Sequence, residues 1–407
     1  MDGEAREAFA AELCRCRAAA GLSLGRVAAD AHVHRAYLHR VEHAERWPSR
    51  AVAAALDGAL NARGVLLDAW ARGETEHREA AEHRRLLAAS LRSSAELDAL
   101  LDPPPGQAAD DALAAADGLG LAYLSTPPGP MLQRALAARD RTMTRLAGLH
   151  RAGPHRELTR AAGYLSGVLA YAALDLGDDR AAAAHAATAH RAGEVVGDGA
   201  LLAWTRGTQS LIARFGQRYA TALELAQAGM TDAGGGTAAP RLLAGQAQSL
   251  ANLGDAEGAH RALTAAEAAR DRAGSDELGG LFTFSPAKLA YYGGSALIWL
   301  DGADDARRAL DGAVEAITLW EAGERAELPE DDHALAHVYA STAAVQLGEL
   351  DRAAAMLTPV LALPAERRIS WLRKRVTRVG ELLGTDRFAG SDEADALRTT
   401  VAAFAAP

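Results

Sequence analysis

The chain has 407 residues, of which 49% are hydrophobic and 24% charged, enough to build a buried core and more than one domain. Its formal net charge of −10 argues against a protein that coats nucleic acid through bulk electrostatics. No apolar run approaches the ~18 residues of a membrane-spanning helix, and the start MDGEAREAF is acidic where a signal peptide would be basic. We therefore expect a cytoplasmic protein with no membrane partner.

The charge is unevenly distributed along the chain. Residues 1–72 contain ten arginines and nine acidic residues, so the acidic excess lies in the remainder. Residues 34–50 are more basic still, with four arginines against Glu42 and Glu45: Arg35, Arg40, Arg46 and Arg50. This pattern predicts a local basic surface on an acidic protein.

The segment LSLGRVAADAHVHRAYLHRVEHAERWPS, residues 22–49, has the layout of a helix-turn-helix. Ser23 is a suitable N-cap for a short helix with one apolar face, formed by Leu24, Val27, Ala28 and Ala31. After a turn at His32 and Val33, a second apolar stripe contains Tyr37, Leu38 and Val41. Ser49 then begins a further helix with Val52, Leu56 and Leu60 on its apolar side. These helices should pack on one another.

The opposite side of the second of these helices has the composition of a surface that contacts DNA bases. An arginine can donate two hydrogen bonds to guanine, a histidine can donate or accept, and an alanine leaves room for a thymine methyl group. The predicted exposed residues are Arg35, Ala36, His39, Arg40 and His43.

The stretch AAAGLSLGRVAADAHVHRAYLHRVEHAERWPS resembles the five-helix, lambda-repressor-like DNA-binding domain of Xre-family regulators, over residues 5 to about 72. By position, the resemblance implies that Arg35, Ala36, His39 and Arg40 face bases, while Ser23, Arg26, Arg46 and Arg50 lie near phosphates. With His34 at the start of the recognition helix, the predicted DNA-binding residues are Ser23, Arg26, His34, Arg35, Ala36, His39, Arg40, Arg46 and Arg50.

Three positions depart from the family pattern. Leu24 replaces a glutamine that bonds phosphate, His34 replaces the Ser or Thr cap, and His32 replaces the glycine of the turn. A positive φ at a residue other than glycine costs about 1 kcal/mol, although histidine is enriched there. These departures leave open a degenerate domain that does not bind DNA.

Prolines divide the rest of the chain. Residues 74–92 predict a charged helix, which LLDPPPGQAADD, residues 100–111, interrupts; STPPGP at 125–130 makes a second break. We therefore predict a helix-turn-helix domain at 1–72, a helical and Pro-rich linker at 73–110, and a helical array at 111–407.

The array repeats a turn that contains glycine. Glycines 177, 216, 254, 302, 348 and 384 are separated by 39, 38, 48, 46 and 36 residues, and each lies between Ala-rich helical stretches. Small residues recur five or seven positions before these glycines, or five after them, where closely packed helices need them: Ala170, Ala182, Ala247, Ala259, Ser295, Ala343 and Ala353. Such helix pairs cannot bury their apolar faces alone. The sequence therefore predicts an all-α protein whose array is a right-handed solenoid like that of tetratricopeptide (TPR) repeats.

Over its full length the chain resembles Xre-type regulators with a C-terminal tetratricopeptide-like array, common in actinomycetes. The resemblance implies transcription control by a ligand or partner held in the solenoid. The first helix of each pair should line the concave face, where amides, arginines and aromatic rings can bind a peptide or small molecule. The predicted effector-binding residues are Tyr164, Tyr171, Arg206, Ser210, Arg214, Gln248, Asn252, Tyr292, Trp299 and Gln346, with Asp175 and Arg241 also near this face. The alternative is that these residues are ordinary core and surface.

Motifs for catalysis, cofactors or metals find little support. The sequence has no Gly-rich phosphate loop and no HExxH. HALAH, residues 333–337, has metal-compatible spacing, but its context PEDDHALAH is typical of a helix N-terminus. We expect no enzyme, no cofactor and no metal site.

Two functions remain open. The first is a ligand-responsive transcriptional regulator that binds an inverted repeat in double-stranded DNA as a homodimer. The second is an adaptor whose solenoid captures a partner polypeptide and whose helix-turn-helix domain does not bind DNA.

Overall fold

The computed structural model describes residues 3–100, 110–147, 152–323 and 328–405. Its regular structure within these ranges is entirely helical, which confirms the predicted all-α class. None of the described helices combines the length and apolar character needed to cross a bilayer. The chain divides into two compact units, Met1–Leu86 and Leu87–Ala406, which are considered in turn.

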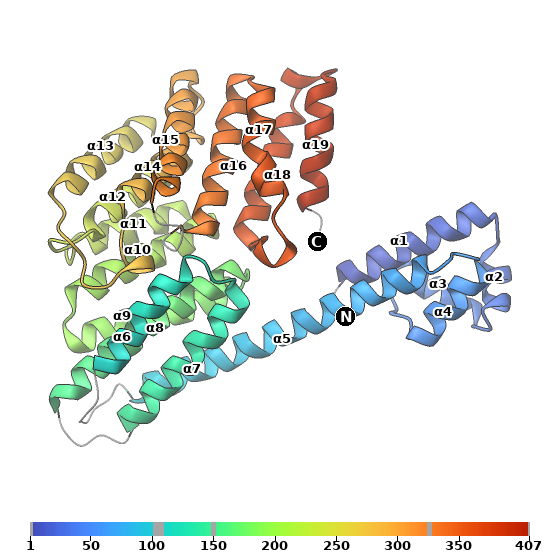
Figure 1. Ribbon diagram of the computed structural model, residues 1–407, viewed down its shortest axis with the longest axis horizontal. Coiled ribbons are helices and arrows are strands. Elements are labelled where there is room, and N and C mark those ends of the chain that lie inside the picture. Colours follow the sequence, from blue (N-terminus) through green and yellow to red (C-terminus); the bar gives the residue numbers. More distant parts are fainter. Residues whose placement is uncertain (1–2, 101–109, 148–151, 324–327, 406–407) are drawn as a thin grey trace. The chain divides into compact units, whose positions relative to one another are not determined.

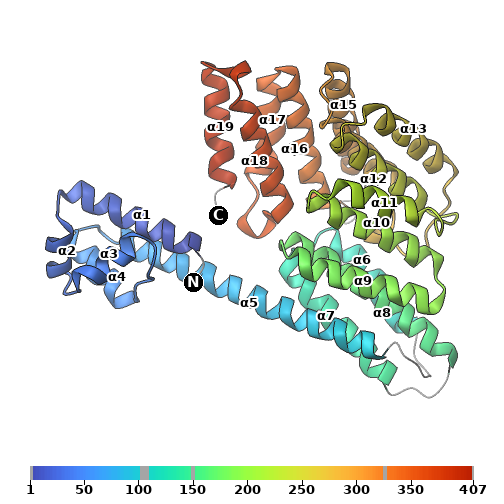
Figure 2. The same ribbon diagram turned by 180° about the vertical axis from the view of Figure 1, so that it is seen from behind.

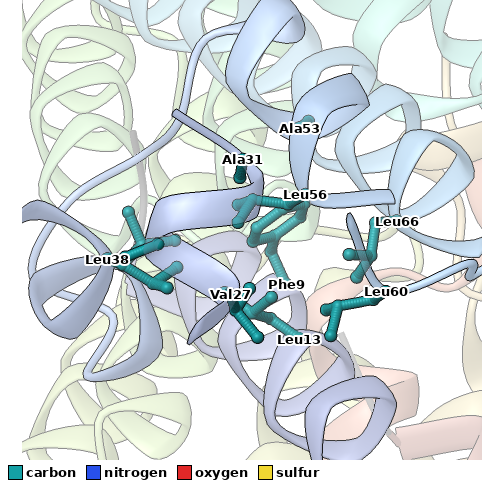
Figure 3. Close-up of a cluster of buried hydrophobic side chains, with 11 residues drawn as sticks. Phe9, Leu13, Val27, Ala31, Leu38, Ala53, Leu56, Leu60 and Leu66 are labelled. Carbon is teal, nitrogen blue, oxygen red and sulfur yellow. The ribbon is translucent and has the colours of Figure 1, made fainter. Parts of the chain in front are cut away.

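The first unit is the predicted helix-turn-helix domain. It contains α1 (Gly3–Ala20), α2 (Leu24–Asp30), α3 (Arg35–Glu42), α4 (Arg50–Ala59) and the first part of α5 (Val65–Leu100). Ser23 and Ser49 are the predicted N-caps: their Oγ atoms accept from Arg26 N and Val52 N, each at 3.3 Å. Figure 3 shows the core, to which all five helices contribute buried side chains, among them Phe9, Leu13, Val27, Leu38, Leu56 and Leu66. Each such side chain stabilises the fold by about 1.5–3 kcal/mol.

The three unusual residues of the helix-turn-helix have identifiable conformations. His34 is itself the N-cap of α3, because its Nδ1 accepts from Ala36 N at 3.3 Å, as a Ser or Thr oxygen would. Leu24 packs against the core. His32 has a φ of 54°, in the left-handed region expected at this turn position, where the family pattern has a glycine. Its side chain is exposed. Of the three departures, only His32 carries a backbone cost.

The second unit is a stack of antiparallel helix pairs (Figures 1 and 2). The pairs are α6 (Asp110–Tyr123) with α7 (Pro128–Ala147), α8 (Ala152–Asp175) with α9 (Asp179–Val196), α10 (Gly199–Phe215) with α11 (Tyr219–Gly229), α12 (Ala238–Asn252) with α13 (Ala256–Arg272), α14 (Pro286–Leu297) with α15 (Ala303–Glu321), α16 (Glu330–Leu347) with α17 (Leu350–Leu361), and α18 (Ser370–Leu383) with α19 (Asp392–Ala405). Short 3₁₀ turns are η1 (Gly280–Phe282), η3 (Ala365–Arg367) and η4 (Asp386–Phe388). The solenoid predicted from the repeats is present.

The six predicted glycines all lie in the turns between paired helices. Gly177, Gly254 and Gly348 have φ values of 83°, 83° and 85°, which a side chain would strain. In the turn after α10, the left-handed residue is instead Gln217, with a φ of 56°. The seven small residues predicted between helices are all buried, so both repeat signals are explained by close helix packing.

The solenoid closes on itself through contacts between its second and last pairs. Ser370 Oγ, at the start of α18, donates to Leu174 O of α8 at 3.1 Å. Next to it, Trp371 Nε1 donates to Asp175 Oδ1 at 3.2 Å. Residues almost 200 positions apart therefore meet, and the inner helices surround a small, partly open space.

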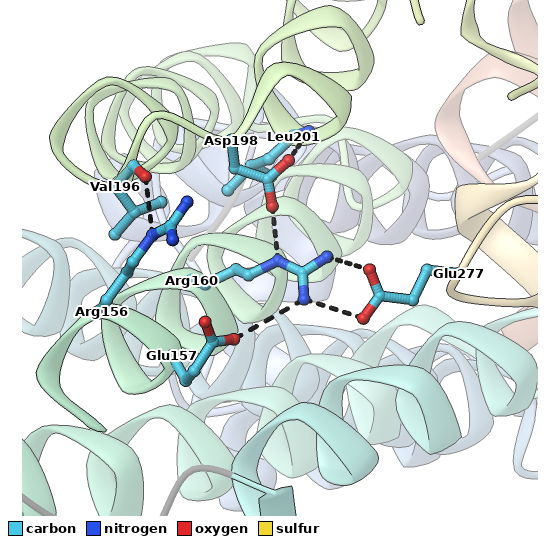
Figure 4. A network of polar contacts seen from close by, with 7 residues as sticks. All are labelled: Arg156, Glu157, Arg160, Val196, Asp198, Leu201 and Glu277. Atoms are coloured by element: carbon cyan, nitrogen blue, oxygen red, sulfur yellow. Dashed lines mark hydrogen bonds and ion pairs between the residues drawn. The ribbon is translucent and has the colours of Figure 1, made fainter. Parts of the chain in front are cut away.

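Residues 273–285, which we call the closing segment, join α13 to α14 across the concave face. Gly279 N donates to Asp117 Oδ1 of α6 at 2.7 Å. Figure 4 shows that Arg160 of α8 binds both Asp198, through Nε at 2.5 Å, and Glu277 of the closing segment, through Nη1 at 2.9 Å. These ion pairs raise the pKa of Arg160 and lower the pKa of Glu277. The segment is thus bound to α6 and α8.

The C-terminal part of α5 belongs to the second unit. The sequence assigned residues 73–110 to a linker; in the structure α5 continues without interruption to Leu100, and 87–100 lie in the second unit. The Pro-rich stretch at 101–109 falls outside the described residues.

A buried polar cluster attaches this part of α5 to α7, α8 and α9. Arg139 of α7 is 0% exposed. Its guanidinium donates to Ser93 Oγ at 3.0 Å, Ser94 Oγ at 3.1 Å, Ser166 Oγ at 3.2 Å and the Ser90 carbonyl at 2.8 Å. Since a buried charge is costly unless its donors are satisfied, these partners explain why an arginine is tolerated there.

His185 of α9 completes the cluster as a neutral imidazole. Its Nδ1 lies 2.5 Å from Ser94 Oγ and 3.3 Å from Arg139 Nη1. Because Arg139 can only donate, Nδ1 must accept, which places the imidazole proton on Nε2 next to Ser90 Oγ. Burial, together with the charge of Arg139, lowers the pKa of His185 to about 3.

This cluster predicts a specific pH dependence. Between pH ~6.5 and ~3 the unfolded chain protonates His185 and the folded chain does not, so its contribution to stability is lost as the pH falls. His185→Gln should remove this dependence, by up to about 1.4 kcal/mol per pH unit. Urea unfolding followed by circular dichroism at several pH values within that window measures it. Ser166→Ala, in the same cluster, is the control and should lower stability equally at each pH; an unchanged slope in His185→Gln would contradict a neutral His185.

The turn before α3 gives a second prediction. His32→Gly should raise the free energy of local unfolding of α2 and α3 by about 1 kcal/mol, because glycine relieves the left-handed strain. Native-state hydrogen exchange of the full chain measures this locally. The control Ala29→Gly, at an exposed helical position, should lower it by about 1 kcal/mol. Reduced protection in His32→Gly would refute the strain.

Candidate functional site

The first candidate site is the exposed side of α3 and its surroundings. The nine predicted DNA-binding residues lie on four elements, from the α2 N-cap to the start of α4, and every one is solvent-exposed: Ser23, Arg26, His34, Arg35, Ala36, His39, Arg40, Arg46 and Arg50. The buried side of α3 carries Leu38 and Val41, as predicted. The structure therefore presents the basic side chains to solvent and the apolar ones to the core.

An ion pair between α1 and α3 positions this helix. Arg17 donates to Glu42 through Nε at 2.5 Å and through Nη2 at 3.1 Å. The Glu42 side chain is 5% exposed. A two-pronged pair of this kind fixes orientation as well as distance. The pair also neutralises Glu42, one of the two acidic residues in the basic segment 34–50, so Glu42 does not repel a phosphate.

Other contacts hold the exposed side chains in position. The rings of His39 and His43 stack with centroids 4.0 Å apart. Arg46 lies over the Tyr37 ring at 5.9 Å. Arg26 pairs with Asp30 at 2.8 Å, so its charge is partly neutralised before any phosphate approaches. We therefore expect Arg26 to contribute less to phosphate binding than Arg46 or Arg50.

The second candidate site is a cavity of about 70 Å³ on the inner side of the solenoid. It is lined by the inner helices α6, α8, α10, α12, α14, α16 and α18, together with the closing segment. The first helix of each pair does line the inner face, as the sequence indicated. Because the solenoid closes and residues 273–285 cross it, the result is a partly open cavity instead of an extended groove.

One part of the cavity wall is aromatic. Tyr123 and Tyr171 pack edge to face with centroids 5.7 Å apart, and Phe284 packs on Tyr292 at 5.0 Å. Trp371 of α18 lines the same space. Aromatic walls of this kind bind apolar groups and cations.

The other part of the wall is acidic. Asp175 accepts hydrogen bonds from Tyr123 OH and Trp371 Nε1. Burial raises the pKa of Asp175 well above its ordinary value, and the nearby Asp331 raises it further. Burial also raises the pKa of Asp331, to about 7, against the opposing charge of Arg367. The pKa of Asp332 is raised by burial, with Lys288 and Arg241 opposing.

Two cations also line the cavity, and they differ in how well their hydrogen-bond donors are paired. Arg241 donates to Trp204 O at 2.7 Å, Tyr171 OH at 2.7 Å and Thr208 Oγ1 at 3.0 Å. Lys288 Nζ donates only a long hydrogen bond, to Thr283 O at 3.4 Å, and burial lowers its pKa. The arginine is a structural element of the wall, whereas the lysine is loosely held.

The predicted effector-binding residues separate into four groups. Tyr171 and Tyr292 line the main cavity, as do Asp175 and Arg241. A smaller neighbouring cavity, of about 30 Å³, contains Arg214, Gln248, Asn252, Tyr292 and Trp299. Tyr164 packs against Phe282 of the closing segment, with centroids 5.0 Å apart.

The remaining predicted residues bond to the solenoid itself. Ser210 donates to Ala222 O at 2.7 Å, Arg206 to Gln209 at 3.0 Å, and Gln346 to Ile298 O at 2.8 Å. None of these three lines either of the two cavities just described.

Sequence reasoning missed several cavity residues: Tyr123, Lys288, Tyr291, Asp331, Asp332 and Trp371. Asp331 and Asp332 had a signal, the acidic PEDDHALAH start of α16, but it was interpreted only as a favourable helix N-terminus. Trp371 had none, because only closure of the solenoid brings α18 to α8.

One group within the described ranges has the composition of a metal site. Glu321, His333 and His337 offer ligand atoms within 4.8 Å of one another, and His333 Nε2 lies 3.2 Å from Glu321 Oε1. Tetrahedral zinc with bonds of about 2.1 Å requires ligand atoms about 3.4 Å apart. The group as it stands is wider than that, and we assign no ion to it.

The comparisons with known proteins concern the first site. Residues 8–70 match a family model described as a helix-turn-helix domain. No curated protein matches the chain. The matched range coincides with α1–α4 and the start of α5, and a domain of this kind indicates a DNA-binding regulator.

Proposed function

We propose that the protein is a transcriptional regulator that binds double-stranded DNA through α3 and is controlled by a small molecule held in the solenoid cavity. The observation that carries the DNA-binding part is that a matched helix-turn-helix domain exposes a continuous basic surface on its recognition helix. Arginine and histidine on such a surface bond base edges and phosphates. The rest of the protein then serves regulation, with no catalytic step.

The form of the solenoid supports a small molecule over a peptide. A peptide needs an extended groove along which its backbone can bond. Here Phe282 and Leu281 of the closing segment cover Tyr164 and Trp204, and the space that remains is a small, partly open cavity. A compact molecule with an apolar body fits such a space better.

We further propose that the regulator acts as a homodimer on an inverted repeat. One domain of this size makes few phosphate contacts and binds weakly, whereas two domains spaced by about 10 base pairs or a multiple add affinity and specificity.

The adaptor alternative makes a different prediction about α3. Selection from a random double-stranded DNA pool at near-physiological salt should enrich one inverted repeat, because the exposed arginines bind base edges. Arg35→Ala, His39→Ala and Arg40→Ala should each weaken binding to the selected site by about 1–3 kcal/mol. Arg15→Ala, an exposed arginine of α1, is the matched control and should bind normally. No enrichment together with retained capture of a partner polypeptide would favour the adaptor.

The oligomeric state is a separate test. Light scattering of the purified chain, free and with the selected DNA, should give a mass of two chains, because each half-site needs one helix-turn-helix domain. A stable monomer in both conditions would exclude the dimer.

A further inference from the structure

We propose that the cavity binds a small molecule with a protonated amine on an apolar, aromatic-sized body, and that Asp332 and Asp331 hold the amine. This deepens the proposed function, since the molecule would be the effector, but its binding is measurable without DNA. The proposal follows from which polar groups of the cavity already have partners.

Two of the charged groups are satisfied by the protein. The guanidinium of Arg241 makes three hydrogen bonds and lies 5.0 Å over the Trp204 ring. Asp175 uses one oxygen for Tyr123 and the other for Trp371. Neither group needs a ligand to complete its hydrogen bonding.

The two carboxylates at the start of α16 are not satisfied in the same way. Among the residues that the structure describes, the half-buried carboxylate of Asp332 has no hydrogen-bond donor and no ion pair within 4.0 Å. Lys288, whose charge lowers the pKa of Asp332, donates instead to Thr283 O. Asp331 has one distant partner, Arg367 Nη1 at 4.0 Å, and that nitrogen is itself buried without a hydrogen bond. The cavity thus contains acceptors that lack donors.

Charge decides which donor fits. The cavity lining holds three carboxyl groups, from Asp175, Asp331 and Asp332, and two cations, Lys288 and Arg241. Asp175 is bonded by Tyr123 and Trp371, and burial raises its pKa well above the ordinary value, so the carboxylates that a ligand meets are Asp331 and Asp332, which attract an ammonium group and repel an anion. An ammonium group also supplies N–H donors, which a neutral molecule of the same shape lacks.

The rest of the wall suits the body of such a molecule. Tyr171, Phe284, Tyr291, Tyr292 and Trp371 all line the space next to the two carboxylates. Their ring faces attract a cation and pack on an apolar group. The space is small and partly open, so a ligand of about one ring and a short chain would place its amine at the carboxylates and its far end toward the opening.

Three probes of similar size test whether the ligand must carry a positive charge: 3-phenylpropan-1-amine, 3-phenylpropan-1-ol and 3-phenylpropanoate. Calorimetric titration and thermal unfolding of the full-length protein near pH 7.5 should show binding of the amine. We expect the alcohol to bind at least tenfold more weakly and the carboxylate not measurably, because only the amine pairs with Asp332.

Variants assign the binding to the acidic wall. Asp332→Asn should weaken binding of the amine at least tenfold and change binding of the alcohol less than threefold. Asp331→Asn is the second variant and should also weaken binding of the amine. Asp351→Asn, at an exposed acidic position in the first turn of α17, is the matched control and should bind the amine normally. Circular dichroism confirms that each variant is folded.

The outcomes separate this proposal from the proposed function. Equal or tighter binding of the alcohol or the carboxylate overturns it, as does absence of amine binding, or unchanged amine binding in both folded Asp variants. A DNA selection that fails while the amine binds rejects only the DNA-binding function. A selected DNA site without amine binding rejects only the ligand class.

Discussion

The second unit depends on the hydrogen bonds of one buried carboxyl group. Asp175, at the end of α8, accepts from Tyr123 of α6 and from Trp371 of α18. Through it, the first two helix pairs and the last one are joined at one buried polar centre. Since a buried polar group without a partner is costly, each of the three side chains holds the others in place. This closure converts the concave side of a helical stack into a cavity.

Local rules account for what the sequence predicted well. The glycine turns, the small residues near them and the apolar stripes of α2 and α3 each depend on residues a few positions apart, and the structure shows them as expected. His32 belongs here too: its left-handed φ follows from the turn that it occupies. The exposed side of α3 was predictable for the same reason, because the period of a helix fixes which side chains share a face.

The cavity was predictable only in part, because its composition depends on distant contacts. Tyr171 and Tyr292 could be placed from their position on first helices, but Trp371 reaches Asp175 across almost 200 residues. The closing segment lies in a link that the repeat pattern treats as a spacer, yet it covers Tyr164 and helps to wall the cavity. Asp331 and Asp332 show how far local sequence reasoning reaches. Their position at a helix N-terminus can be predicted from neighbouring residues, whereas the cavity that they line is formed by distant parts of the chain.

Closure also has a consequence for how such an array can change over time. In an open solenoid each repeat contacts only its neighbours, so duplication or loss of one repeat is tolerated. Here the pairs between α8 and α18 span a fixed gap. One pair more or fewer would separate Trp371 from Asp175 and leave a buried carboxyl group without its donor. Closure therefore fixes the number of helix pairs between α8 and α18 in this protein.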